Sequence, residues 1–207
     1  MSSVIENLAP AQALNSRGNN YVKLRQITTK EYDAMIDNGV FDEDDNIELL
    51  NGVIVEKMPK GMKHPTLNDI IAMLLIQKFG DKACVRNQNP IWLDDFSEPE
   101  PDIVLAKAPL ERYFDGHPTP SEIFLIIEIA DSTLGYDRNT KSLAYARAEI
   151  QQYLLLNAQD RTIEDYREPS ADGYQSKQTY RAEQTFNLTA FPNVQLEVND
   201  FLPVEKE

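Results

Sequence analysis

Seven consecutive residues of this chain, Ile123–Ile129, include a single polar side chain, that of Glu128. A strand covered on both faces of a sheet has such a near-continuous apolar run, whereas a half-exposed strand alternates. The segment therefore predicts a buried strand in a layered fold. It also places a carboxylate where burial is costly unless the group is paired or binds a metal. An acid that faces solvent at the end of the strand is the alternative.

Two more acids lie in short predicted strands. Asp102 follows Pro101 and opens the strand predicted for residues 102–106, since proline suits the first position of a strand. Glu48 precedes an Asn-Gly pair at positions 51–52, which typically closes a β-hairpin. A solvated acid is the alternative for Asp102, and simple alternation with a polar outer face is the alternative for Glu48.

One lysine lies on a helix that is predicted to pack on the sheet. Lys141 falls within the helix predicted for residues 137–148, on a face that it shares with Ala144 and Tyr145. Small residues and a tyrosine favour burial of this face, which would direct the lysine toward an acidic site. The alternatives are a lysine that extends to solvent and a surface pair with Asp137.

Together these groups have the composition of a metal-dependent phosphodiesterase site. Mg²⁺ and Mn²⁺ take oxygen ligands, so Asp102 and Glu128 are the predicted ligands, and the backbone carbonyl of Ile129 is a third candidate. A bound divalent cation lowers the pKa of a bound water and stabilises the pentavalent phosphate. Lys141 would orient that water or neutralise the phosphate, and Glu48 would hold another water or a second metal.

Helical and strand patterns alternate along the rest of the chain, which predicts a mixed α/β (α+β) domain. We expect one domain over residues 21–207, behind a loose arm at residues 1–20. Helices are predicted to begin at Thr28, with a capping box to Glu31, and at His64. Further strands are predicted at 84–85, 91–93, 153–156, 162–166 and 174–180.

The charge balance limits how the chain could bind nucleic acid. The net charge is −14, and phosphate neutralisation by Lys and Arg supplies most non-specific affinity, so we expect weak intrinsic binding. Basic residues gather in one short stretch that holds Lys57, Lys60, Lys63 and His64. Lys60, Lys63 and His64 are the candidate phosphate contacts. Alternatively, His64 simply starts a helix before Pro65.

Several features bear on the compartment. No apolar stretch approaches the length of a membrane span, and the N-terminus lacks the pattern of a secretory signal. Cys84 is the only cysteine, which excludes an internal disulfide framework and suits a reducing environment. A cytoplasmic protein without membrane contact is therefore expected.

The order of these residues resembles the PD-(D/E)XK superfamily of restriction-endonuclease-like phosphodiesterases. More narrowly, the chain is similar to a large bacterial family of uncharacterised "putative restriction endonuclease" proteins. The matching segments are Glu48-Leu49 before Asn51-Gly52, His64, Glu100-Pro101-Asp102, Ile127 to Thr133, Asp137, Lys141 and Tyr145-Ala146. The resemblance implies a mixed central β-sheet flanked by helices, a nuclease-like domain and, often, a homodimer.

The chain departs from the superfamily at one catalytic position. The usual lysine two residues after the glutamate is replaced by Ala130, and the family pattern implies that Lys141 takes over its role. The family also often has a glutamate where this chain has Gln152.

Two rival functions remain open from the sequence. We expect a Mg²⁺- or Mn²⁺-dependent nuclease that acts on nucleic acid, DNA in the first place. An inactive nuclease-fold domain that binds or regulates is one alternative, and a structural interaction protein with these charges in surface ion pairs is the other.

Overall fold

A six-stranded mixed sheet forms the centre of this computed structural model, which describes residues 24–42, 44–59, 61–131 and 133–203. The strand order is β3-β4-β5-β6-β7-β8. The strands are β3 (Ala83–Asn87), β4 (Ile103–Lys107), β5 (Ile123–Ala130), β6 (Gln152–Asn157), β7 (Thr162–Arg167) and β8 (Ser176–Tyr180). Only β5 and β6 pair in parallel within this sheet, and the other pairs are antiparallel. The mixed sheet with helices on its flanks confirms the predicted fold class.

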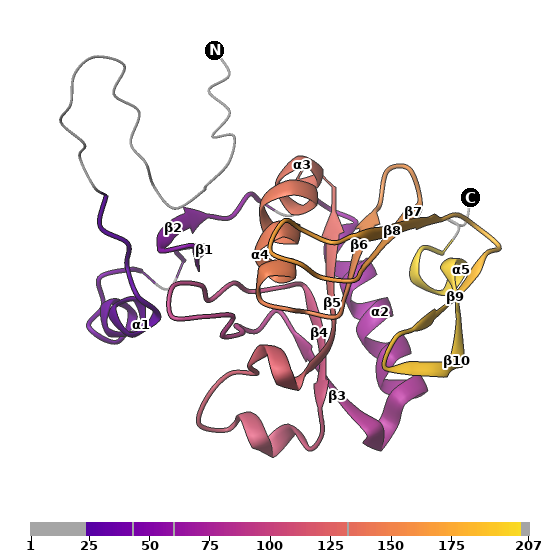
Figure 1. The fold of residues 1–207 in the computed structure, drawn as a ribbon, viewed down its shortest axis with the longest axis horizontal. Helices are drawn as coiled ribbons and strands as arrows, with labels where there is room; N and C mark the ends of the chain where they lie inside the picture. The colour runs from indigo at the N-terminus through magenta and orange to yellow at the C-terminus, as the bar shows by residue number, and fades with distance from the viewer. Residues whose placement is uncertain (1–23, 43, 60, 132, 204–207) are drawn as a thin grey trace, which may run out of the picture.

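Helices cover both faces of this sheet (Figure 1). The long helix α2 (His64–Phe79) packs its buried side chains against one face, together with apolar residues of β4, β5 and β6. The short helices α3 (Leu134–Tyr136) and α4 (Ser142–Arg147) cover the other face, where Tyr145 joins a second apolar cluster. Because β5 lies between these layers, it needs the apolar run seen in its sequence.

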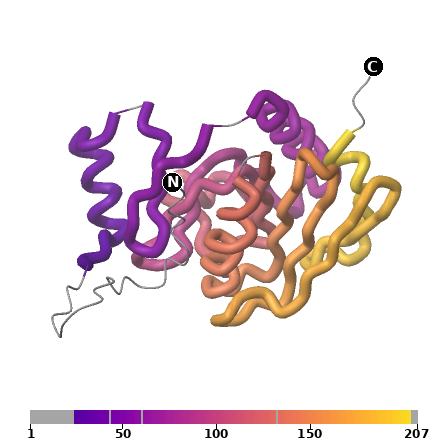
Figure 2. The backbone as a smooth tube through the Cα atoms, turned by 90° about the horizontal axis from the view of Figure 1, so that it is seen from above, coloured from indigo at the N-terminus to yellow at the C-terminus, as the bar shows by residue number. Residues whose placement is uncertain are grey.

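Smaller elements lie at the two ends of the sheet (Figure 2). At one end are α1 (Thr29–Asp37) and the hairpin β1 (Ile47–Leu50) with β2 (Val53–Glu56). At the other end are the hairpin β9 (Thr185–Leu188) with β10 (Phe191–Glu197) and the short helix α5 (Val198–Phe201).

Local sequence signals formed as predicted at the first of these ends. Thr28 and Glu31 make the reciprocal capping box of α1. Asn51 and Gly52 adopt positive φ angles of 52° and 75°, as the tight hairpin turn requires. A backbone bridge between Leu49 and Glu98 then holds β1 against the loop that precedes β4.

Two predicted elements differ from the structure. Residues 91–93 form no strand although Ile91 and Leu93 are buried. The N–H groups of Ile91 and Leu93 donate to Pro99 and Ser97 in one segment, that of Trp92 donates to Pro118 in another, and no continuous ladder forms. The helix predicted for residues 137–148 begins at Leu134 and contains a π-helical segment, Asp137–Lys141. The predicted arm at residues 1–20 lies outside the described residues. Within the described ranges, every helix is too short or too polar to span a bilayer.

Candidate active site

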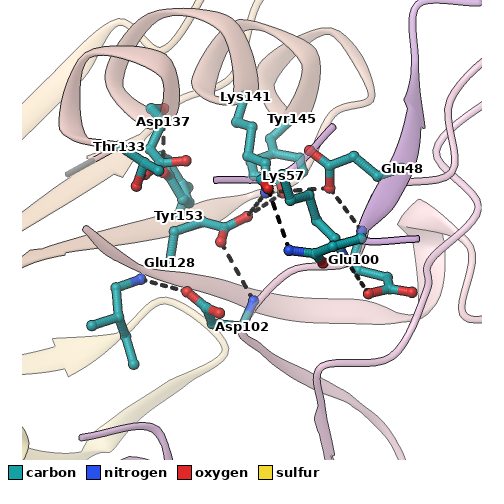
Figure 3. Close-up of polar contacts among 12 residues, drawn as sticks. Glu48, Lys57, Glu100, Asp102, Glu128, Thr133, Asp137, Lys141, Tyr145 and Tyr153 are labelled. Atoms are coloured by element: carbon teal, nitrogen blue, oxygen red, sulfur yellow. Dashed lines mark hydrogen bonds and ion pairs between the residues drawn. The ribbon is translucent and has the colours of Figure 1, made fainter. Parts of the chain in front are cut away.

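A cavity of about 370 Å³ opens where β5 ends and β4 begins. Its lining residues come from β1, β2, the start of α2, the ends of β4 and β5, and the helical segment after β5. They include Glu48, His64, Asp102, Glu128, Ile129 and Lys141, together with Val55, Met58, Pro59, Asp131, Tyr136 and Asp137. Residues that are up to 93 positions apart in the chain, from Glu48 to Lys141, therefore meet around one space (Figure 3).

Glu128 forms the centre of the polar contacts in this cavity. Its side chain points to the face of β5 that α4 covers, and the residue is only 3% exposed, which excludes the solvent-facing alternative. Lys141 Nζ lies 3.0 Å from Glu128 Oε1, and the Tyr145 hydroxyl donates to the same oxygen at 2.6 Å. The backbone N–H of Asp102 reaches Glu128 Oε2 at 3.4 Å. The carboxylate is thus held from two elements of the fold.

Asp102 fills a gap in the sheet ladder. Pairing of β4 with β5 ends at Ile103 and Ile127, so the N–H of Ile129 has no partner on β4. The side chain of Asp102 accepts that hydrogen bond at 2.9 Å through Oδ2. The same oxygen lies 3.0 Å from His64 Nε2, and Asp102 is buried rather than solvated at the start of the strand.

Glu48, on the β1–β2 hairpin, joins Asp102 and Glu128 in the acidic wall of the cavity. The residue is 1% exposed, so the alternative of a polar outer face is wrong. Its Oε2 accepts the N–H of Glu100 at 3.2 Å and lies 3.4 Å from Lys141 Nζ. Its Oε1 is buried and has no hydrogen-bond partner among the described residues. An unpartnered buried carboxylate oxygen is costly and suits a cation or an ordered water.

A π-helical segment presents Lys141 to both glutamates. Such segments are rare and frequently occur at functional sites. Asp137 and Lys141 are both buried, so the surface-pair and solvent-exposed alternatives for Lys141 are wrong. The Thr133 hydroxyl donates to Asp137, whose backbone carbonyl accepts from the Tyr153 hydroxyl at 3.3 Å. These contacts fix the first turn of the segment.

The electrostatics of the cavity show an excess of negative charge. Burial raises the pKa of Glu128 to about 8, and the nearby charge of Asp102 adds to this effect while Lys141 opposes it. Burial likewise raises the pKa of Asp137 to about 6. Burial would lower the pKa of Lys141, but Glu128 and Glu48 raise it well above its ordinary value. Burial would raise the pKa of Asp102, but His64 and the Ile129 amide lower it.

These residues fit a divalent cation that keeps much of its water. Among the described residues, no three His, Cys, Asp or Glu side chains are grouped closely enough to form a protein cage for a metal. Mg²⁺ rarely needs one, since one or two carboxylates and several waters usually suffice. Asp102 and Glu128, the carbonyl of Ile129 on the cavity wall, and the unpartnered oxygen of Glu48 supply oxygen donors of the right type.

The basic cluster is only partly directed at the cavity. His64 is the first residue of α2, but its side chain is buried against Asp102, so it both starts the helix and contacts the acidic site. Lys57 lines the cavity and pairs with Glu100. Lys63 immediately precedes α2 and has an exposed side chain. Lys60 lies outside the described residues.

Sequence reasoning missed several residues of this cavity. Tyr145 was placed on the inward face of its helix, but its hydrogen bond to Glu128 spans 17 positions and has no local signal. Asp131 and Tyr136 also line the cavity, and the Tyr136 hydroxyl is buried without a hydrogen-bond partner among the described residues. A Cβ on Gly61 would lie 1.9 Å from Asp131 Oδ2, so any larger residue at this position would require the Asp131 side chain to move.

The mixed sheet and the grouping of acids and a lysine near the end of β5 define a protein of the restriction-endonuclease-like superfamily. The chain belongs to the Uma2 family, described as "Putative restriction endonuclease", whose model matches residues 29–199. Among solved structures, it resembles a "putative nuclease belonging to DUF820" from Anabaena variabilis ATCC 29413. That match has 19% identity and a TM-score of 0.65, and it covers 84% of this chain and 97% of the other. A comparison with proteins of curated function found no match.

Proposed function

We propose that this chain is a divalent-cation-dependent nuclease that hydrolyses phosphodiester bonds in DNA. The observation that carries the proposal is the grouping of Glu48, Asp102 and Glu128 around Lys141 in one cavity. Membership of a family described as restriction endonucleases supports the reaction class. We further propose that it works in the cytoplasm as a homodimer, without membrane contact.

In this proposal the acidic wall holds Mg²⁺ or Mn²⁺. Asp102, Glu128 and the carbonyl of Ile129 are the ligands. The cation would supply an activated water and charge neutralisation at the scissile phosphate. Tyr145 and Lys141 orient Glu128 through their contacts with Oε1. His64 orients Asp102 through Oδ2, in addition to the phosphate contact predicted for it.

Lys141 and Glu48 act on the substrate side of the site. The pKa of Lys141 lies well above its ordinary value because of Glu128 and Glu48, so Lys141 remains an ammonium at neutral pH and can neutralise phosphate charge. Glu48 Oε1 has no protein partner among the described residues, so it is available to accept a hydrogen bond from the attacking water. Lys60 and Lys63 would contact the flanking phosphate backbone.

The test combines metal binding with cleavage. We expect the wild type to bind Mn²⁺ in calorimetry and to nick plasmid DNA, and we expect Glu128→Gln and Asp102→Asn each to lose binding and at least a hundredfold in cleavage rate. Glu98→Gln is the matched control, because Glu98 is 4% exposed but does not line the cavity. Equal metal affinity and cleavage in all four proteins would refute the assignment. DNA binding without metal binding or cleavage in the wild type would favour the inactive binding module instead.

A further inference from the structure

A second cavity, of about 380 Å³, lies beside the edge strand β3, away from the acidic site. Its walls are the end of β3 and the helical turn Leu110–Tyr113 that follows β4. In Figure 1, β3 forms one edge of the sheet, next to β4. Arg86, Asn89 and Phe114 are among its lining residues.

Arg86 is buried in this cavity wall without an acidic partner. The residue is 9% exposed, and within the described ranges no carboxylate lies within ion-pair distance of its guanidinium group. The group stacks over the Tyr113 ring at 5.3 Å and makes one long hydrogen bond, 3.4 Å from Nη2 to Asn89 Oδ1. Its Nε is buried and has no hydrogen-bond partner among the residues that the structure describes. Since a buried charge is costly unless it is paired, the site is suited to an anion.

An exposed aromatic side chain lies at the rim of the cavity that contains Arg86. Phe114 is 89% exposed and Leu110 is 54% exposed, and both line the cavity. The exposed side-chain amides of Asn87 and Asn89 lie at the same rim. Glu111 also lines the cavity and is exposed, so its carboxylate weakens the attraction for an anion. A ligand for this site therefore combines an anionic group with a flat apolar body.

We propose that this second cavity binds one nucleotide of a single-stranded nucleic acid, with its phosphate on Arg86 and its base stacked on Phe114. A guanidinium group pairs with phosphate through parallel hydrogen bonds, and an exposed aromatic ring stacks with any base. The inference rests on the proposed function for the choice of a nucleic acid over other anions. A strand held here would contact the protein outside the acidic cavity.

The experiment measures binding in EDTA, where the proposed metal site cannot contribute. A fluorescently labelled dT12 oligonucleotide is titrated with the full chain and followed by anisotropy. We expect Arg86→Gln and Phe114→Ala each to weaken binding about tenfold, since stacking of one base has an effect of this size. We expect Glu111→Gln to strengthen it. Arg181→Gln and Met73→Ala are matched controls, because both residues are exposed and neither lines the cavity.

Competitors identify the source of the nucleotide. Displacement by dTMP only at concentrations far above those of dT12 would support binding of a strand. Displacement by dTMP at concentrations close to those of dT12 would assign the site to free nucleotides and overturn the inference. Equal displacement by a dT12·dA12 duplex, or displacement by a carboxylate-ended peptide alone, would overturn the inference.

Unchanged affinity in folded Phe114→Ala would also overturn the inference. This variant decides the question even if Arg86→Gln fails to fold, because the Phe114 side chain is exposed. The result is independent of cleavage. Loss of metal-dependent cleavage in Glu128→Gln tests the active site alone, and oligonucleotide affinity in EDTA tests this cavity alone.

Discussion

Replacement of Lys141 by methionine tests whether this residue is the counter-charge of the acidic wall. Lys141 is 6% exposed, and its Nζ lies 3.0 Å from Glu128 Oε1 and 3.4 Å from Glu48 Oε2. With an effective dielectric constant of about 20, each contact has an attraction of about 5 kcal/mol, and the desolvation of the three charges offsets much of it. Removal of one partner of a buried pair typically costs about 3–5 kcal/mol. We expect Lys141→Met to lower the free energy of unfolding by this amount.

The decrease in the free energy of unfolding that Lys141→Met causes should grow as the pH rises. Burial raises the pKa of Glu128 to about 8 in the wild type, and removal of Lys141 raises it further. As the pH rises, a growing fraction of Glu128 carries its charge beside the Lys141 ammonium in the wild type, whereas in the variant this charge has no ammonium partner. The destabilisation should therefore be larger at pH 9 than at pH 6.

Chemical unfolding in urea with EDTA, at pH 6 and pH 9, measures both effects. In thermal melts of the same proteins, the melting temperature at pH 9 should fall by about 10 °C, because each kcal/mol shifts it by about 2–4 °C in a chain of this size. Lys177→Met is the control, because the Lys177 side chain is exposed and its partner, the buried Glu164, keeps the hydrogen bonds from Arg138 and Tyr166. We expect a loss below about 1 kcal/mol. The double variant Lys141→Met with Glu128→Gln should recover part of the stability. A change within about 1 kcal/mol at both pH values for Lys141→Met would refute the reasoning.

Three further predictions follow from single features of the chain. Burial raises the pKa of Glu98 from 4.5 to about 7, so the folded state binds the proton more tightly and the free energy of unfolding falls between these pH values. In thermal melts, Glu98→Gln should be more stable than the wild type at pH 8 by about 1–2 kcal/mol after allowance for solvent screening, with no gain at pH 4. Binding of duplex DNA should be weak, should fall steeply with salt in titrations at several ionic strengths, and should weaken further in Lys60→Ala with Lys63→Ala; tight, salt-insensitive binding would contradict this. Lys141→Ala should abolish cleavage, and added Ala130→Lys should restore part of it in the same nicking assay, because positions 128 and 130 share one face of β5.

Features with a local physical cause could be predicted from the sequence. The strand predicted at Ile123–Ile129 matches β5 to within one residue, because burial on both faces requires an apolar side chain at nearly every position. The hairpin turn at Asn51 and Gly52 and the capping box at Thr28 are likewise set by backbone geometry over two to four residues. Glu128 was found by the same logic, as a charge that burial makes costly.

Features that depend on distant partners could not be predicted. The contact of His64 with Asp102 joins positions 38 apart, and no local pattern marks it. Residues 91–93 also depend on distant partners. Their apolar pattern predicted burial correctly, but a strand also needs a neighbouring strand with a continuous hydrogen-bond ladder. An apolar pattern within one segment can predict burial, whereas strand pairing also depends on a second segment.

The π-helical segment Asp137–Lys141 explains how a lysine on a helix can replace one on the strand. A regular helix has 3.6 residues per turn, so an apolar pattern with this period predicts which helix face packs on the sheet. It cannot reveal a widened π-helical turn. Here Lys141 and Tyr145 both reach Oε1 of Glu128. On β5, Ala130 is 1% exposed and has no charge of its own to contribute. The ammonium therefore approaches Glu128 from the helical layer instead of along the strand. In this chain the ammonium of Lys141 therefore lies beside the Glu128 carboxylate although the position two residues after Glu128 is an alanine.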